Sequence, residues 1–315
     1  MTVLAAQAAR HSASPEPLQK DGLPLLAAGN LRAVVAADSG GRIAEFWRES
    51  RDGRRDVIVP MPPGHFDADA WPKAGIYPLI PWSNRIRNAR FSFGDREATL
   101  RPHPACAPHA LHGFGHAHRW QITQRSAISL TMGLRHDPSE NKEAGWPWAF
   151  EARQTVTLDL VGLAIEIDIR NMSAEPMPVG FGSHPFFVAR AGDVVEFSAE
   201  AEWAVDETGC ATTRRELGAA RQRIVAGSSE TRHFSAWSGI ATLRRQSGER
   251  VIVQASSPLN HLVAHAPSGA DYVCVEPVSH VVDAFNLDAA GAPDTGAFAL
   301  APGESRAAVV RISLE

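Results

Sequence analysis

Two side chains in this sequence have the chemistry of a proton-transfer pair. Glu276 follows the apolar run Tyr272–Val275 and precedes Pro277, so we expect it at the end of a strand, half enclosed by apolar neighbours. Desolvation raises the pKa of a carboxyl group toward the value that a general base needs. His184 precedes Pro185, which favours an extended backbone, and an imidazole exchanges protons near neutral pH. Taken singly, each residue also fits a structural role, as a salt-bridged glutamate and a packed histidine.

Other polar residues offer hydrogen bonds to a ligand. Asn84 and Arg85 stand at a loop-to-strand junction and supply several donors. His112 is followed by nearby glycines that let the backbone turn tightly and approach a ligand. This glycine pattern does not indicate a phosphate loop, because neither a Lys-Ser/Thr pair nor a helix follows it. His280 lies four residues after Glu276, where it could line a cleft, although a loop position is the simpler interpretation.

A metal site has to be weighed because histidines are dense between residues 103 and 118. His112 and His116 have helical spacing, but the glycines between them argue against a helix, and no HExxH motif occurs. We therefore predict no metal, and we interpret His103, His116 and His118 as surface or loop residues. The three lysines stand in polar, loop-like contexts unsuited to Schiff-base chemistry, and no nucleotide motif is found, so we predict no cofactor.

The elements that must position these groups are short strands. From Gln154 to Asn171, apolar and polar residues alternate on both sides of a turn at Val161-Gly162, which predicts a hairpin with one buried face. Further predicted strands are Leu31–Ala37, Arg42–Trp47, Phe91–Phe93, Ile128–Arg135, Val194–Ser198, Ala241–Arg244, Val251–Gln254 and Ala307–Leu314. No long helical periodicity competes with them. The sequence therefore predicts an all-β sandwich or barrel.

Composition excludes several other classes of protein. The chain has 315 residues, 44% apolar and 21% charged, which fits a globular protein with a sizeable core. A net charge of −4 without a basic run gives no support for nucleic-acid binding, and no apolar stretch has transmembrane length. We predict a loose tail over residues 1–20, without the features of a signal peptide, and a single domain over residues 21–315. Three widely spaced cysteines predict no disulfide framework, so we expect a reducing, cytoplasmic location.

Taken in order, four segments resemble the aldose 1-epimerase (galactose mutarotase-like) family. They are Asn84-Arg85-Ile86, Leu111-His112-Gly113, His184-Pro185-Phe186-Phe187 and Glu276-Pro277. The similarity extends over roughly residues 25 to 314 through the framing motifs Gly145–Trp148, Arg170-Asn171, Asp283–Asn286 and Pro302–Glu304. Each motif alone is weak, but four of them in this order are specific.

The resemblance implies a large antiparallel β-sandwich with a sugar site in a cleft on one sheet. It also implies that Glu276 is the general base and His184 the general acid, while His112 and Arg85 hold the sugar, with Asn84 beside them. The implied reaction is mutarotation, which opens and recloses the ring of a sugar hemiacetal. A proton leaves the anomeric oxygen and another reaches the ring oxygen, so acid–base groups suffice and no cofactor is needed.

One segment departs from the family pattern. The family often has an aspartate that binds a sugar hydroxyl three residues before a phenylalanine. Here Thr231 stands at that position, followed by Arg232 and then by Phe234. We take Thr231 and Arg232 as candidate substrate-binding residues. The missing aspartate puts specificity for galactose or glucose in doubt, and an arginine could favour an acidic or phosphorylated sugar.

Two alternatives keep the fold but change the function. A carbohydrate-binding module would bind sugar without needing an acid–base pair. A polysaccharide lyase or hydrolase is the other alternative, and a hydrolase would need two positioned carboxylates where the sequence offers one strong candidate, Glu276. The expected partner is a small-molecule sugar, rather than nucleic acid or membrane, and the expected assembly is a monomer or homodimer.

Overall fold

The structure is a computed structural model that describes residues 18–64, 66–70 and 72–315. Most of the predicted tail therefore lies outside the described residues. Two residues assigned to that tail, Gln19 and Lys20, instead form a short strand that pairs with the strand at Leu23–Ala28. Strand pairing is therefore present in part of the segment that composition alone had suggested was loose.

Strands dominate the described part of the chain, joined by four short 3-10 helices and one short α-helix. The strands are β1 (Gln19–Lys20), β2 (Leu23–Ala28), β3 (Leu31–Ala36), β4 (Arg42–Ser50), β5 (Gly53–Asp56), β6 (Ile76–Leu79), β7 (Arg85–Ile86), β8 (Arg90–Phe93), β9 (Arg96–Thr99), β10 (Ala110–Leu111), β11 (Gln121–Arg125), β12 (Ser129–His136), β13 (Phe150–Leu158), β14 (Gly162–Asn171), β15 (Met177–Val179), β16 (Gly182–Val188), β17 (Val194–Val205), β18 (Ala211–Val225), β19 (Glu230–Arg244), β20 (Arg250–Ala255), β21 (His261–Ala266), β22 (Tyr272–Val278), β23 (Phe298–Leu300) and β24 (Ser305–Leu314). The helices are η1 (Arg87–Ala89), η2 (Pro104–Cys106), η3 (Gly115–Ala117), η4 (Lys142–Ala144) and α1 (Ala284–Ala289). Among the described residues, no helix is long and apolar enough to cross a membrane.

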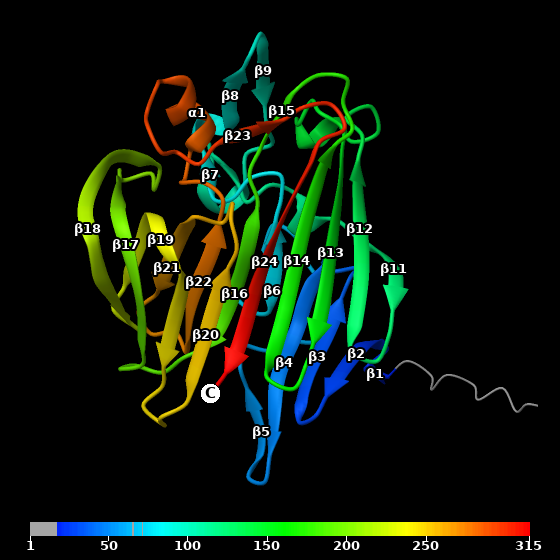
Figure 1. The fold of residues 1–315 in the computed structure, drawn as a ribbon. Coiled ribbons are helices and arrows are strands. Elements are labelled where there is room, and N and C mark those ends of the chain that lie inside the picture. Colours follow the sequence, from blue (N-terminus) through cyan, green and yellow to red (C-terminus); the bar gives the residue numbers. More distant parts are fainter. Residues whose placement is uncertain (1–17, 65, 71) are drawn as a thin grey trace, which may run out of the picture.

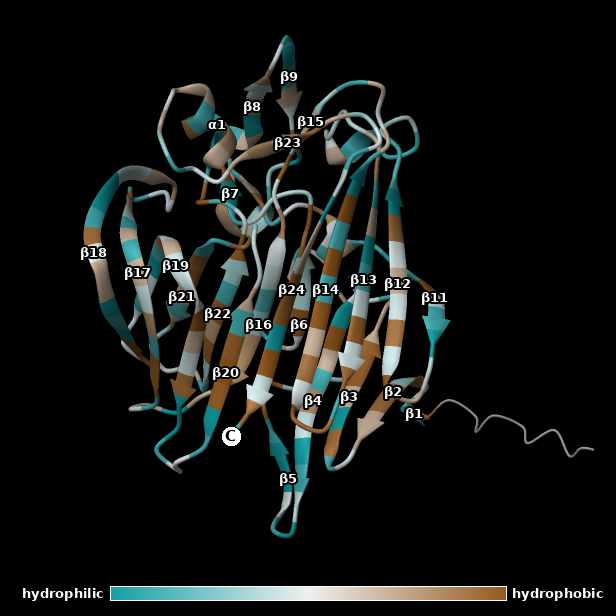
Figure 2. Ribbon diagram, in the orientation of Figure 1, coloured by the Kyte–Doolittle hydropathy of each residue, from teal (hydrophilic) through white to brown (hydrophobic). Residues whose placement is uncertain are grey.

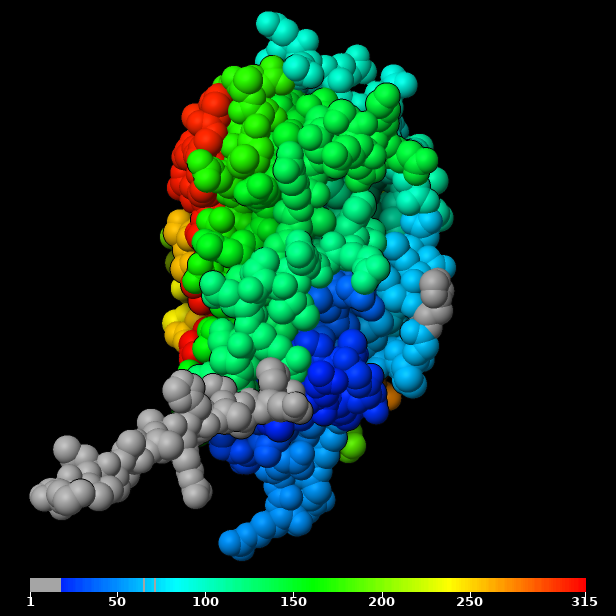
Figure 3. Space-filling model, turned by 90° about the vertical axis from the view of Figure 1, so that its right-hand side faces the viewer, coloured from blue at the N-terminus to red at the C-terminus, as the bar shows by residue number. Residues whose placement is uncertain are grey.

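The strands form two antiparallel layers that share one long strand (Figure 1). One layer, here called the site layer, runs through β2, β3, β4, β6, β16, β22 and β21. The other, the cover layer, runs through β11, β12, β13, β14, β24 and β20. The first part of β19 pairs with β21 and its last part with β20, so this strand belongs to both layers. Figure 3 shows the molecule from the side, with the red end of the chain opposite the light-blue segments. The predicted all-β sandwich is confirmed.

Strand alternation separates the core from the face that carries polar groups. On β22, Val273 and Val275 join the main hydrophobic cluster between the layers, whereas Cys274 and Glu276 point to the opposite face. A smaller cluster on that outer face contains Tyr77, Leu79, Phe186, Val263, Cys274 and Val278. Figure 2 shows the same mixing of brown and teal residues along the strands of both layers. The site layer is therefore apolar on one face and mixed on the other.

All the predicted strands are present, and most of them are longer than predicted. The predicted hairpin is confirmed as β13 and β14, and its apolar residues Val156, Ile165 and Ile167 are buried in the core. The strand that carries Glu276 does not stop at Pro277, because β22 continues to Val278 in register with β21. Strand β6 pairs with β4 and β16, although the sequence predicted no strand there. Tertiary pairing decides these limits, which local propensity cannot.

The turn after β10 gives the first testable prediction. Gly113 has a φ of +66°, and an added Cβ would lie 1.9 Å from the Ile80 carbonyl oxygen. Gly94 has a similar φ of +56° but open space around it, so it reports backbone strain alone. We expect Gly94→Ala to cost about 1 kcal/mol of unfolding free energy. Gly113→Ala should cost about 3 kcal/mol, because overpacking adds to the strain. Urea unfolding checks this, and equal losses in both variants would contradict it.

Candidate active site

Glu276 and His184 lie side by side on neighbouring strands of the site layer. In the pairing of β16 with β22, Gly182 faces Val278 and Phe186 faces Cys274, which brings His184 opposite Glu276. His184 Nε2 lies 3.3 Å from Glu276 Oε1, and both side chains are buried. They line a cavity of about 520 Å³ on the outer face of the layer. The acid and the imidazole can therefore reach a single small ligand.

Burial controls the protonation of this pair. Desolvation raises the pKa of Glu276 to about 8. Desolvation also holds the pKa of His184 well below its usual range, with smaller contributions from the positive charges of His265, Lys73 and Arg42. At neutral pH the pair therefore retains one proton. Burial favours this proton on the Glu276 carboxyl group, because both side chains are then neutral. Because the two groups are in contact, this proton belongs to the pair rather than to either residue.

Aromatic rings hold the His184 imidazole in place. Its ring stacks on Tyr77, with centroids 4.6 Å apart, and on Phe186, with centroids 4.7 Å apart. His112 meets it edge-on at 5.2 Å. Tyr77 lies opposite His184 on the neighbouring strand β6, and Phe186 lies two residues further along the strand of His184, so sheet geometry sets the position of both rings. This packing fixes the orientation of the imidazole against Glu276.

His112 and Asn84 fix each other through two hydrogen bonds. The Asn84 backbone N–H donates to His112 Nδ1 at 3.0 Å, and the His112 N–H donates to the Asn84 carbonyl at 2.9 Å. Both residues have positive φ, +57° for Asn84 and +61° for His112. Since Nδ1 accepts a hydrogen bond and burial lowers the pKa of His112 well below its usual range, the neutral ring carries its proton on Nε2. His112 is thus a hydrogen-bond donor at the cavity wall.

Arg85 is placed by contacts on both sides of its backbone. Its N–H donates to Asn84 Oδ1 at 2.9 Å, and its carbonyl accepts from the Asp283 N–H at 2.9 Å. The guanidinium passes over Gly209, where an added Cβ would come within 2.9 Å of Nη1. Arg85 lines the same cavity as Glu276. The motif at Asp283–Asn286, far along the chain, therefore positions this arginine.

Thr231 and Arg232 point to opposite faces of β19. Thr231 lines the cavity and shares a hydrogen bond of 2.7 Å with His265 Nδ1. Arg232 donates from Nε and Nη2 to the Glu202 carboxylate at 2.6 and 3.0 Å, and its guanidinium packs on Phe234. The structure thus does not bring Arg232 into the cavity, because adjacent residues of a strand alternate between faces. The predicted role of Arg232 in substrate binding is therefore not supported, because its guanidinium pairs with Glu202 outside the cavity.

Comparison with known proteins identifies the family. The family model for aldose 1-epimerase matches residues 24–313. The chain belongs to the aldose 1-epimerase family. It is 27% identical to the uncharacterized protein YphB of Escherichia coli K12 over 92% of this chain and 98% of that protein. A putative aldose 1-epimerase from the same organism has a TM-score of 0.78 at 26% identity, covering 93% of this chain and 98% of that one.

The fold extends to more distant relatives. A galactose mutarotase-like protein from Clostridium acetobutylicum has a TM-score of 0.76 at 20% identity, covering 92% of this chain and 94% of that one. At this identity the likeness concerns the fold. The two-layer arrangement described above is therefore the galactose mutarotase-like fold that the sequence motifs had suggested.

Several cavity residues were not predicted from the sequence. They are Asp69, Ala70, Lys73, Tyr77, His103, Ala105, Leu111, Phe186, Val263, His265 and Tyr272. Phe186 could have been found from strand period, since it lies two residues after His184 on the same face. Lys73 and His265 carried no local signal, because only the pairing of distant strands brings them to the site. The aromatic lining includes Tyr77, Phe186 and Tyr272, whereas Trp146 and Trp148 are in the core.

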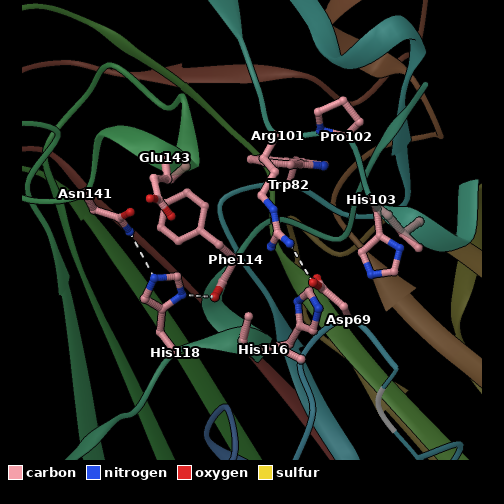
Figure 4. Close-up of a pocket in the computed structure, with 15 residues that line it drawn as sticks. Asp69, Trp82, Arg101, Pro102, His103, Phe114, His116, His118, Asn141 and Glu143 are labelled. Atoms are coloured by element: carbon pink, nitrogen blue, oxygen red, sulfur yellow. Dashed lines mark hydrogen bonds and ion pairs between the residues drawn. The ribbon is translucent and has the colours of Figure 1, made fainter. Parts of the chain in front are cut away.

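A second, smaller chamber of about 160 Å³ adjoins the cavity of this family member (Figure 4). Asp69, His103 and Leu111 line both spaces. His118 is fixed there by the Phe114 carbonyl and Asn141. His103 and His116 are buried, so neither is a surface residue, although His103 does lie in a loop, as predicted. Glu276 and His184 do not line this smaller chamber, so the chamber is not favoured as the reaction site.

One trio beside the cavity has the atoms of a metal site. Ligand atoms of His184, Cys274 and Glu276 lie within 4.8 Å of one another, and all three residues are buried. Nitrogen, sulfur and oxygen ligands suit zinc, but a thiol ligand must be deprotonated. Desolvation and the neighbouring Glu276 raise the pKa of Cys274 well above its usual range. The trio is therefore arranged better for proton exchange than for holding a cation, and the expectation of no metal remains a prediction.

His280 has a structural role that the sequence did not indicate. It is buried, and its Nε2 accepts a hydrogen bond of 3.1 Å from the Ser83 N–H. Its Nδ1 donates to the Val281 carbonyl at 2.6 Å, which fixes the tautomer. His280 neither lines the cavity nor lies on an exposed loop. It supports the segment that carries Asn84 and Arg85.

The raised pKa of Glu276 should make the unfolding free energy depend on pH. Its folded pKa of about 8 exceeds the value of 4.5 expected for the unfolded chain, so its contribution is fully present below pH 4.5 and is lost as pH rises through 8. Between pH 6.5 and 8 we expect the unfolding free energy to fall by about 2 kcal/mol because of this group. Glu276→Gln should lack this decline. Urea unfolding of both proteins at several pH values checks it, and parallel pH dependence would contradict the assignment.

Proposed function

We propose that this protein is an aldose 1-epimerase in activity, interconverting the α and β anomers of an aldose. The observation that carries the proposal is the buried contact of 3.3 Å between Glu276 and His184 inside a cavity. Mutarotation requires one group to accept a proton and another to deliver one at two oxygens bonded to the same carbon. Two groups in contact, sharing one proton, match that requirement.

The protons balance over the proposed reaction. In the ionised form of the pair, Glu276 takes the proton of the anomeric O1 while protonated His184 delivers its proton to the ring oxygen. The bond between C1 and the ring oxygen breaks, and O1 becomes the aldehyde oxygen. Both groups are then neutral, which is the form that their burial favours. Rotation about C1–C2 and the reverse transfers reclose the ring as the other anomer.

The remaining cavity residues supply orientation in this proposal. The neutral His112 ring donates from Nε2, and Arg85 and the Asn84 side chain stand beside it. Thr231 adds a hydroxyl to the cavity lining. These groups are held by backbone hydrogen bonds, so they are preorganised before a sugar binds.

The alternative functions have less support. A hydrolase would need a second positioned carboxylate, and the other acid that lines the cavity, Asp69, is paired with Arg101 at 2.5 Å. A carbohydrate-binding module would gain nothing from desolvating an acid and an imidazole in contact, since burying such groups is costly. The acid–base pair therefore favours catalysis over binding alone.

Removing either member of the pair tests the proposal. We expect Glu276→Gln and His184→Asn each to lower the rate of anomer exchange by about 10²–10⁴-fold, because proton transfer is lost. Polarimetry or NMR exchange measures the rate, and circular dichroism checks that the fold is kept. Glu143→Gln is the matched control, since Glu143 lines only the adjoining chamber and should leave the rate unchanged. Near-normal exchange in Glu276→Gln would remove the assignment of the base.

The pH profile offers a separate test. The profile of kcat/KM should fall above about pH 8, where the pair loses its shared proton. It should also fall well below pH 6.5, where His184 takes up a second proton for the pair. We therefore expect a broad plateau around neutral pH. Exchange rates that rise steadily through pH 9 would contradict the requirement for a shared proton.

A further inference from the structure

Thr231 and His265 form a second hydrogen-bonded pair at the wall of the cavity. They lie directly opposite each other on β19 and β21, and Thr231 Oγ1 is 2.7 Å from His265 Nδ1. Both side chains line the cavity that contains Glu276 and His184. Thr231 is exposed and His265 is half-buried, whereas Glu276 and His184 are buried. The Thr231–His265 pair therefore stands toward the open side of the cavity.

Sheet register fixes how far this pair lies from the acid–base pair. On β22, Glu276 faces Val263 of β21, and Cys274, two residues earlier, faces His265. His265 is therefore one strand across and two residues along from Glu276, a separation of about 8 Å between the two Cα atoms. Because both side chains line the same cavity, a single sugar ring held at Glu276 can reach His265 with its far side.

The Thr231–His265 pair offers a ligand one donor and one acceptor, whichever way its own hydrogen bond runs. If the threonine hydroxyl donates to Nδ1, the neutral ring has a donor at Nε2 and the threonine oxygen remains an acceptor. If Nδ1 donates to the hydroxyl oxygen, Nε2 is the acceptor and the hydroxyl hydrogen is the donor. Among residues 18–64, 66–70 and 72–315, His265 Nε2 has no hydrogen-bond partner. A sugar hydroxyl, which both donates and accepts, matches this pair better than an anion, which only accepts.

We propose that the Thr231–His265 pair determines specificity by binding a hydroxyl on the C3–C4 edge of an aldopyranose. This inference rests on the proposed anomer exchange, since it names the part of the substrate that the same cavity recognises. In that reaction Glu276 and His184 engage O1 and the ring oxygen, so the bond between C1 and the ring oxygen lies against them. The edge of a six-membered ring opposite this bond is C3–C4. The preferred substrate is therefore a pyranose with free hydroxyls on that edge.

Sugars that lack a single hydroxyl test which edge is recognised. Anomer exchange is measured for glucose and galactose, and for the 3-deoxy, 4-deoxy and 6-deoxy analogues of the better substrate. We expect the 3-deoxy or the 4-deoxy sugar to lose about 10-fold in kcat/KM, mainly through KM, because one hydrogen bond made throughout the reaction is missing. The 6-deoxy sugar should lose little. An equal or larger loss for the 6-deoxy sugar, or no loss at C3 and C4, would overturn the inference.

Variants connect the missing hydroxyl to the Thr231–His265 pair. Thr231→Val removes the hydroxyl but keeps the shape, and His265→Phe removes both nitrogens but keeps a ring. Each should raise KM for the complete sugar by about 10-fold. Each should also reduce the loss caused by the sensitive deoxy sugar to less than about 3-fold, because the partner of that hydroxyl is already gone. Thr231→Ser should retain the wild-type pattern.

Thr131→Val is the matched control for these variants. Thr131 also forms a hydrogen bond between neighbouring strands, 3.1 Å from the Thr155 hydroxyl, but it lies in the cover layer outside the cavity. Its loss should leave KM and the deoxy-sugar pattern unchanged. A purely structural role of Thr231 and His265 would change KM for every sugar by the same factor. Losses of that additive kind would contradict the proposed contact.

Binding measurements separate this inference from the proposed function. Kd values from NMR titration with the same sugars report hydroxyl recognition without any exchange. Binding that depends on the C3 or C4 hydroxyl together with Thr231 and His265, but without exchange, would refute the epimerase activity and retain the specificity role. Exchange whose dependence on those hydroxyls is the same in wild type and variants would refute the specificity role and retain the activity. Neither binding nor exchange with glucose and galactose would refute both.

Discussion

The contact between Glu276 and His184 across β16 and β22 is the constraint on which the rest of the site depends. The two groups are desolvated together, so neither ionises independently and one proton serves both. That arrangement is possible because each strand has one face in the core and the other in the cavity. Val273 and Val275 pack in the core between the layers and fix β22 in place. This packing keeps Glu276 in a buried position, where water cannot solvate its charge.

Whether an element of the fold or the site could be predicted depends on how far apart in the sequence its interacting residues lie. The hairpin of β13 and β14 could be predicted because its period-2 pattern and its turn lie within one short segment. The pairing of β16 with β22 could not be predicted from pattern, since some ninety positions separate His184 from Glu276 and no local signal encodes it. The family resemblance supplied the two residues, but the register that joins them comes only from the sheet.

The residues that prediction misplaced show the same limit. Thr231 and Arg232 are adjacent in sequence, so their side chains lie on opposite faces of β19. Only the orientation of this strand in the sheet decides that Thr231 reaches the cavity while Arg232 pairs with Glu202. His280 looked like a loop residue because its partner, the Ser83 backbone, is distant in sequence. Lys73 looked like an ordinary loop lysine for the same reason. In each case the chemistry of the side chain was evident, and the missing information was its neighbour.

The surroundings of His184 extend this logic one layer outward. Arg42 is fully buried, and its guanidinium nitrogens have no hydrogen-bond partner among residues 18–64, 66–70 and 72–315. It lies instead over the ring of Tyr77 at 4.2 Å and the ring of Phe66 at 4.9 Å, and Tyr77 stacks on His184. Its charge helps to lower the pKa of His184, and burial lowers its own pKa to about 10. The charge of Arg42, on the far side of the Tyr77 ring, thus disfavours a positive charge on His184. A protonated His184 is therefore a stronger acid than a free imidazolium and would readily pass its proton to a ring oxygen.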